Sequence, residues 1–160
     1  MITQQQCLDL FEYRDGELFW KVRKAKANHI GDKAGHLNNT GYYRVSIDYK
    51  LYLIHRIIFL MHHGYLPQFL DHIDNNPQNN RIENLRPATK TQNICNTSLR
   101  KNNTSGVKGV VWIRSIKKWE VRVDINHKRH TFGYFKDLAE AAKVAEKARN
   151  ELHKEFARHE

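Results

Sequence analysis

The chain has 160 residues, of which 40% are hydrophobic and 28% charged, and its formal net charge is +10. This composition is typical of a folded, water-soluble chain of one or two small domains and not of a disordered one. No apolar run approaches the roughly 20 residues of a membrane span. The first residues lack the basic and apolar stretch of a secretory signal, so we expect a cytoplasmic protein without a membrane partner.

The positive charge is concentrated in one segment. Residues 99–136 hold ten Lys and Arg against two Asp and Glu, whereas residues 1–98 hold twelve against nine and residues 137–160 five against six. Each Lys or Arg that meets a phosphate releases condensed counterions, so the segment predicts a polyanionic partner. The alternative is a solvated basic face without a partner. The two cysteines, Cys7 and Cys95, cannot build a four-cysteine zinc site.

The first part of the chain predicts a mixture of short elements. Alternation of Tyr43, Val45 and Ile47 with polar residues is typical of a half-buried strand. Gly64 is expected to end a helix, because glycine tolerates the backbone conformation that follows a last helical turn. The expected elements are a helix at 4–11, a turn at 14–16, strands at 18–21 and 42–49, and a helix at 52–63.

The middle of the chain predicts a strand, a loop, a second strand and a helix. The strand spans 69–74 and runs into the Asn-rich turn composition of 75–80. Residues 85–88 predict an edge strand, because Pro87 cannot donate to a central ladder. Thr89 suits the N-cap of a helix that continues through Asn93.

The last third predicts three strands and one amphipathic helix after a polar linker at 97–106. The strands are expected at 107–113, 119–125 and 129–134. Asp137 and Glu140 form a capping signal for the helix. One apolar helix face is expected to hold Leu138, Ala141, Ala142, Ala145, Ala148, Leu152 and Phe156. The fold class is therefore α+β, with domains at 1–98 and 99–160.

Asp71 and His72 are the sharpest candidates for chemistry. The predicted strand, loop, strand and helix would bring Asp71, His72 and Asn93 together. Carboxylate and amide oxygens are ligands that suit Mg²⁺, and a histidine, with an intrinsic pKa near ~6.5, can act as a general base. Taken alone, the pair is equally compatible with a turn that holds a hydrogen-bonded histidine.

A wider pattern resembles the HNH endonucleases of phages and mobile introns over residues 15–97. The resemblance rests on Gly41 to Val45, His55-Arg56, Asp71 to Asp74, Asn79 to Arg86 and Gln92-Asn93. It implies a ββα-metal fold and metal-dependent DNA cleavage. Other histidines carry less weight: for His55 we expect packing or a phosphate contact rather than catalysis.

The resemblance also implies roles for individual residues. Asp71 and Asn93 resemble the metal ligands, His72 the general base, and Asn84 the central asparagine that holds the loop by hydrogen bonds. Many members have histidine at the last position, whereas this chain has Asn93. An oxygen ligand there favours Mg²⁺, or else Mn²⁺, over Zn²⁺ or Ni²⁺.

The C-terminal segment resembles the ethylene-response-factor (Apetala-type) DNA-binding domain over residues 103–157. The resemblance rests on Ser105 to Val110, Trp119, Gly133 to Phe135 and Ala141-Ala142. It implies a three-stranded sheet packed on one helix, with a sheet face that enters the major groove of DNA. The candidate DNA contacts are Lys108, Trp112, Arg114, Lys118, Arg122 and Arg129.

Together these patterns predict a metal-dependent endonuclease acting on double-stranded DNA without an organic cofactor. A homodimer is compatible with the sequence but not indicated by it. Two alternatives remain: an inactive DNA-binding protein on a nuclease scaffold, and an RNA-binding protein.

Overall fold

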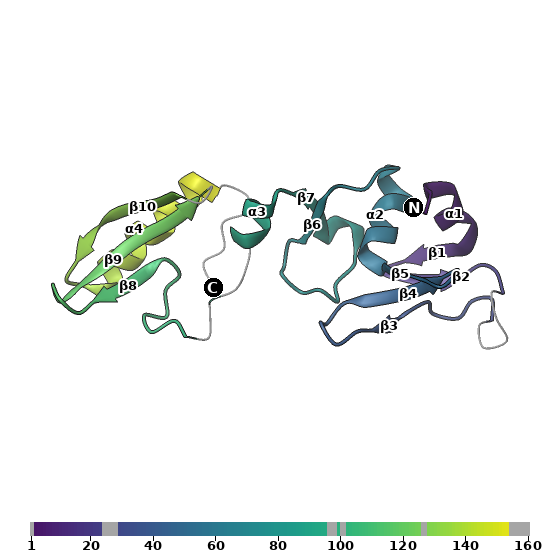
Figure 1. Cartoon of the computed structure of the whole chain (residues 1–160), viewed down its shortest axis with the longest axis horizontal. Coiled ribbons are helices and arrows are strands. Elements are labelled where there is room, and N and C mark those ends of the chain that lie inside the picture. The colour runs from purple at the N-terminus through teal and green to yellow at the C-terminus, as the bar shows by residue number, and fades with distance from the viewer. Residues whose placement is uncertain (1, 24–28, 96–98, 100–101, 126–127, 154–160) are drawn as a thin grey trace. The chain divides into compact units, whose positions relative to one another are not determined.

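The computed structural model describes residues 2–23, 29–95, 99, 102–125 and 128–153, which are coloured in Figure 1. The chain divides into two compact units, Met1–Ala88 and Thr89–Glu160, and each is described by itself. The described residues combine helices with antiparallel strand pairs, which confirms the mixed α and β character. None of their helices has the length and apolarity needed to cross a membrane.

The first unit begins with a helix, a hairpin and a three-stranded sheet. Thr3 caps the helix, because its side chain accepts from Gln6 N–H while the Gln6 side chain accepts from Thr3 N–H. Val45 and Ile47 are buried and Tyr43 is half-buried, which confirms the predicted alternation. The bounds are α1 Gln4–Leu10, β1 Phe11–Arg14, β2 Glu17–Trp20, β3 His36–Leu37, β4 Tyr43–Ile47 and β5 Lys50–Leu53.

The predicted helix start at residue 52 was wrong. Tyr52 and Leu53 belong to β5 and pair with Val45 and Arg44 of β4. Backbone groups engaged in this ladder cannot also form helical hydrogen bonds, so helix α2 spans Ile54–His63. It ends as expected at Gly64, whose φ is 76°.

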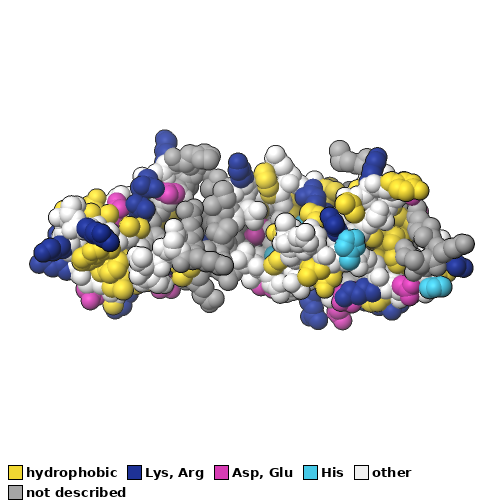
Figure 2. Space-filling model, turned by 60° about the horizontal axis from the view of Figure 1, so that its bottom comes forward, with side chains coloured by type: hydrophobic (Ala, Val, Ile, Leu, Met, Phe, Trp, Pro, Cys, Tyr) yellow, Lys and Arg dark blue, Asp and Glu magenta, His cyan; other side chains and the backbone are white. Residues whose placement is uncertain are grey.

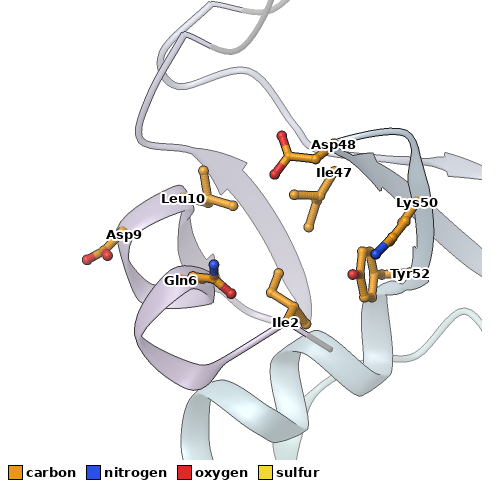
Figure 3. A pocket seen from close by; sticks show the side chains of 8 residues that line it. All are labelled: Ile2, Gln6, Asp9, Leu10, Ile47, Asp48, Lys50 and Tyr52. Carbon is orange, nitrogen blue, oxygen red and sulfur yellow. The ribbon is translucent and has the colours of Figure 1, made fainter.

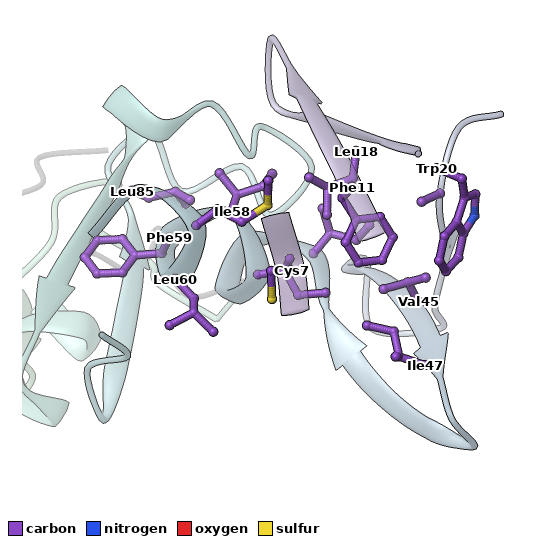
Figure 4. Close-up of a cluster of buried hydrophobic side chains, with 14 residues drawn as sticks. Cys7, Phe11, Leu18, Trp20, Val45, Ile47, Ile58, Phe59, Leu60 and Leu85 are labelled. Atoms are coloured by element: carbon purple, nitrogen blue, oxygen red, sulfur yellow. The ribbon is translucent and has the colours of Figure 1, made fainter. Parts of the chain in front are cut away.

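Helix α2 forms the centre of the main hydrophobic core. Its residues Ile54, Ile57, Ile58 and Met61 are buried on one face, and so are residues outside that face, such as Phe59. Figure 4 shows this cluster, with Cys7, Phe11, Leu18, Trp20, Val45, Ile47 and Leu85 contributed by other elements. Because α2 is buried on most sides, the packing fixes the position of the buried side chains that it carries, His55 among them.

The first unit ends with two paired strands on either side of a loop. Strand β6 spans Phe69–His72, the 3-10 helix η1 spans Ile82–Asn84, and β7 spans Leu85–Ala88. The strand register places Asp71 opposite Arg86 and His72 opposite Leu85. Within the part of the chain that the structure describes, β7 pairs with β6 alone, so Pro87 lies in an edge strand as expected.

The second unit contains a short helix and a three-stranded sheet that packs on a longer helix. The bounds are α3 Lys90–Cys95, β8 Val110–Ile113, β9 Lys118–Ile125, β10 Lys128–Phe135 and α4 Leu138–His153, with strand order β10-β9-β8. The core contains Val110, Val121, Ala141 and Ala145. Leu152, expected on the apolar face of α4, is 38% exposed, and Phe156 lies outside the described residues.

The first strand of this sheet starts later than the sequence predicted. Gly109 has a φ of +80°, and the Val110 N–H donates to the Val107 carbonyl, so residues 107–109 form a turn. The Gly109 carbonyl accepts from Arg122 N–H of β9. The same close approach puts a Cβ at Gly109 2.8 Å from the Arg122 oxygen, which only glycine avoids.

We predict that Gly16→Ala destabilises the first unit more than Gly31→Ala. Both glycines have a φ near +90°, but a Cβ at Gly16 would lie 2.8 Å from Arg81 N, whereas nothing lies within 4 Å of one at Gly31. The shared backbone strain costs about 1–2 kcal/mol, and the steric conflict at Gly16 adds about 1–3 kcal/mol. Urea denaturation of both variants measures the difference, and equal losses would contradict this packing.

Candidate active site

Asp71 and His72 lie at the end of β6 and are both buried. Asp71 is 4% exposed, and its Oδ2 accepts from Arg86 Nε at 3.0 Å and Nη2 at 2.9 Å. The strand register explains this pair, because Arg86 is directly opposite Asp71 in β7. A carboxylate shielded from water needs a counter-charge, and the Arg86 guanidinium supplies it.

His72 has a polar partner on one side and aromatic rings on another. Its Nε2 lies 3.1 Å from Asn80 Oδ1, in a contact that is buried on both sides. The ring centroid of His72 is 5.0 Å from that of His55 in an edge-on arrangement, and 6.0 Å from that of Tyr42. The imidazole is therefore confined by residues of three segments: Tyr42 before β4, His55 in α2 and Asn80 in the loop after β6.

Asn84 ties the Asn-rich loop to the end of the hairpin. Its Oδ1 accepts from Asp74 N–H at 3.1 Å, and its Nδ2 donates to Asp74 Oδ1 at 2.9 Å and to the Asn79 carbonyl at 2.7 Å. The Ile73 N–H also donates to the Asn84 carbonyl at 2.9 Å. Both ends of the side-chain amide are used, so the loop cannot move without breaking several hydrogen bonds.

Asp74 acts as the acceptor at the centre of this loop. It also accepts from Asn76 N–H at 2.8 Å and from Asn79 Nδ2 at 2.6 Å. Burial acts to raise the pKa of Asp74, but the hydrogen bonds from the loop outweigh it and hold the pKa below its usual value. The contribution to stability is present at neutral pH and is lost as the pH falls through the lowered pKa.

The N-terminal elements hold the outer side of the same loop. The Tyr13 hydroxyl accepts from Ile82 N–H at 3.1 Å. The turn at Gly16 packs directly on the backbone of Asn80 and Arg81. Because β1 and β2 carry these contacts, the hairpin positions the loop that contains Asn80.

His55 lies in α2 beside His72 and was not predicted as part of the site. It is 5% exposed, and among the described residues its Nδ1 is the one buried side-chain nitrogen or oxygen without a hydrogen-bond partner. Burial lowers the pKa of His55 to about 3, with further contributions from His72 and Arg56. The His55 ring is therefore neutral at neutral pH. Its place in the His55-Arg56 motif was the signal available in the sequence.

The first unit brings Asp71, His72 and Asn84 together, while Asn93 belongs to the second unit. Thr89 begins α3 as predicted: its Oγ1 accepts from Gln92 N–H at 3.2 Å, and Gln92 Oε1 accepts from Thr89 N–H at 2.7 Å. Asn93 is exposed on this helix, and its N–H donates to the Thr89 carbonyl at 3.0 Å. Its role as a metal ligand stays a prediction.

The candidate DNA contacts of the second unit lie on different faces. Strand register puts Lys118, Arg122 and Arg129 on the sheet face opposite α4. Trp112 is opposite Trp119, with ring centroids 4.9 Å apart, on the face that packs against the helix. The other two candidates precede and follow β8: Lys108 in the turn before it and Arg114 in the turn after it.

Two acidic residues that the sequence did not single out share the open sheet face. Arg122 Nη1 lies 3.3 Å from Glu120 Oε2, and Arg129 Nε lies 3.0 Å from Asp124 Oδ1. Figure 2 shows Lys and Arg side chains with magenta acidic groups among them at the β8–β10 end of the chain. Carboxylates therefore orient both guanidinium groups, of which that of Arg129 is exposed and that of Arg122 half-buried.

A separate hollow of about 380 Å³ lies beside α1 and the β4–β5 hairpin. Figure 3 shows Asp48, Lys50 and Tyr52 facing it from the hairpin, with residues of α1 opposite. None of Asp71, His72 and Asn84 lines it, so the hollow is distinct from the polar cluster at β6.

The polar cluster falls inside the segment that matches a known family. Residues 52–94 match the HNH endonuclease family model. Protein 3.8 of Escherichia phage T7 is 40% identical over 90 residues, which are 56% of this chain and 74% of that protein. The chain therefore belongs to the same family as Protein 3.8, and its residues 52–94 form a segment that matches the HNH endonucleases.

A second relative comes from another virus. An uncharacterized HNH endonuclease of Acanthamoeba polyphaga mimivirus is 35% identical over 125 residues, which are 76% of this chain and 64% of that protein. The chain thus spans slightly less than two thirds of the mimivirus protein. No solved structure matches the chain.

We predict that Asn84→Ala lowers the free energy of unfolding by about 1–3 kcal/mol, because it leaves buried polar groups without partners. Asn39→Ala, at an exposed turn position, is the matched control and should change it by less than about 0.5 kcal/mol. Chemical denaturation followed by circular dichroism measures both variants. A loss no larger than that of the control would show that Asn84 does not hold the loop.

Proposed function

We propose that the protein is a divalent-metal-dependent endonuclease that hydrolyses double-stranded DNA at the end of β6. The observation that carries the proposal is the buried Asp71-His72 pair inside the segment that matches the HNH family. Hydrolysis of a phosphodiester needs an activated water and a means to stabilise charge on the phosphate and the departing oxygen. In this proposal His72 activates the water, and Asp71 holds the cation that stabilises the charge.

The donor set fits a hard cation. Asp71 would hold the metal through its carboxylate, and Asn93 is the second ligand that the family resemblance implies. Mg²⁺ is commonly bound by one or two carboxylates together with waters and substrate phosphate. An amide oxygen in place of an imidazole nitrogen at the second ligand position favours Mg²⁺ or Mn²⁺ over zinc. When bound, the cation stabilises negative charge on the phosphate.

The side chains around Asp71 have separate tasks in this proposal. Arg86 orients the Asp71 carboxylate through Oδ2. His72 accepts a proton from the attacking water as the general base. Asn84 keeps the loop after β6 in place, so that the histidine stays at one position relative to the carboxylate.

The open face of the C-terminal sheet is proposed to hold the DNA. Lys118, Arg122 and Arg129 lie on this face, within the segment that carries most of the excess positive charge. Phosphate contacts by such residues supply affinity, while base-edge contacts supply sequence preference. The carboxylates of Glu120 and Asp124 orient two of the guanidinium groups, and oriented guanidinium groups favour base readout.

DNA binding without cleavage is a second candidate function. The ion pair of Arg86 with Asp71 favours it, because a cation would have to share that carboxylate with a guanidinium. Salt-sensitive DNA binding without any metal-dependent nicking would identify this second function.

We predict that His72→Ala lowers the rate of plasmid nicking in Mg²⁺ by about 10² to 10⁴-fold, because the general base is lost. DNA affinity should remain within a few fold. His63→Ala, at the exposed end of α2, is the matched control and should nick like the parent. Removal of the metal with EDTA should stop nicking by the parent and by the control. Equal rates for the parent and His72→Ala would contradict the assigned role.

We predict that Lys118→Ala weakens DNA binding and lowers the slope of log affinity against log salt by about one, because one phosphate contact is lost. Lys147→Ala is the matched control: Lys147 is an exposed lysine of α4, outside the proposed sheet face. Fluorescence anisotropy with a labelled duplex at several salt concentrations measures both. The same slope for Lys118→Ala and the parent would place the DNA elsewhere.

A further inference from the structure

The hydrogen bond between His72 and Asn80 specifies which nitrogen of the His72 ring carries the proton. A neutral imidazole has one nitrogen that donates and one that accepts. His72 Nε2 lies 3.1 Å from Asn80 Oδ1, and an amide oxygen can only accept. The hydrogen is therefore on Nε2, and the lone pair that can take a proton is on Nδ1.

Asn80 is placed to impose this tautomer because it has little freedom of its own. It is 2% exposed, and its N–H donates to the Gln78 carbonyl at 3.2 Å. The Gly16 turn lies against its backbone, where a Cβ at Gly16 would be 3.0 Å from the Asn80 carbonyl carbon. A hydrogen bond shielded from water is stronger than an exposed one, so an alternative orientation of His72 is disfavoured.

The rings around His72 limit its rotation further. His55 meets the His72 ring edge-on with ring planes at 71°, and Tyr42 lies at 50° to both rings. A rotation of the imidazole by 180° about its Cβ–Cγ bond would put Cε1 in the place of Nε2 and Cδ2 in the place of Nδ1, and would therefore break the hydrogen bond to Asn80. The packing and the hydrogen bond therefore favour the same orientation.

We propose that Asn80 is a positioning residue that fixes His72 with the hydrogen on Nε2, so that Nδ1 accepts the proton of the attacking water. The inference rests on the proposed nuclease function and adds to it the residue that positions the base. Replacement of a group that fixes the tautomer of a metal-ligating histidine typically costs about 10- to 100-fold in metal affinity or activity, and we expect a comparable loss for the histidine base here.

The test uses the full chain with Asn80→Leu, Asn80→Asp and the control Gln78→Leu. Asn80→Leu keeps the size of the side chain and removes the acceptor, whereas Asn80→Asp keeps an acceptor oxygen at the same position. Gln78→Leu makes a similar change at an exposed position of the loop. Cleavage of a duplex in Mg²⁺ gives kcat and KM, and thermal unfolding shows whether each variant is folded.

We expect kcat to fall about 10- to 100-fold in Asn80→Leu with KM nearly unchanged. Asn80→Asp should recover most of the lost rate, and Gln78→Leu should match the parent. A folded Asn80→Leu that cleaves as fast as the parent would overturn the proposal. So would a loss confined to KM, because a positioning residue acts on the chemical step.

A second measurement reads the tautomer without activity or metal. Long-range ¹H–¹⁵N correlation spectra of the His72 ring distinguish a hydrogen on Nε2 from one on Nδ1. The Nε2–H form in the parent is expected, and the Nδ1–H form would overturn the proposal even if Asn80→Leu did not fold. If the parent shows Nε2–H but never cleaves DNA, the proposed function fails and the catalytic role of Asn80 fails with it, while the hydrogen bond stands.

Discussion

Arg86 meets the Asp71 carboxylate where water has little access to either group, since their side chains are 15% and 4% exposed. Desolvation of a charge costs several kcal/mol unless a partner compensates it, so the β6–β7 hairpin must place a positive charge beside Asp71. The strand register does this, because it puts Arg86 directly opposite Asp71. It also places His72 one residue further on, at the mouth of the Asn-rich loop.

The polar groups of the Asn-rich loop also need partners, and asparagine amides supply them in place of charged groups. Asparagine can donate and accept at once, and Asn79, Asn80 and Asn84 use this to connect the loop to Asp74 and His72. The N-terminal hairpin then covers the loop through Tyr13 and Gly16. A site supported by a hydrogen-bonded loop and a packed hairpin is preorganised, which catalysis by positioned groups requires.

Local sequence patterns predicted most elements. Errors arose where pairing between strands determined whether a residue lies in a helix or in a strand. The alternation in β4 and the end of α2 at Gly64 were readable because they depend on neighbouring residues. Tyr52 lies in a strand because β4 pairs with it, and no local signal reveals that. Asp71 and His72 were predicted from a motif, whereas the contacts of His72 with His55 and Asn80 could not be predicted because they depend on packing between separate segments. The open face of the C-terminal sheet likewise became visible only with the strand register, which separates Trp112 from Arg122.

The central claim is that the end of β6 is a metal-dependent hydrolytic centre in which Asp71 is a ligand. The most direct measurement is the rate of plasmid nicking by the parent and by Asp71→Asn over a range of Mg²⁺ concentrations at fixed ionic strength. The account predicts nicking by the parent that saturates with Mg²⁺. It also predicts that Asp71→Asn needs a much higher Mg²⁺ concentration to reach any comparable rate, because a neutral amide binds a hard cation more weakly than a carboxylate. The same Mg²⁺ dependence and rate in both proteins would contradict it.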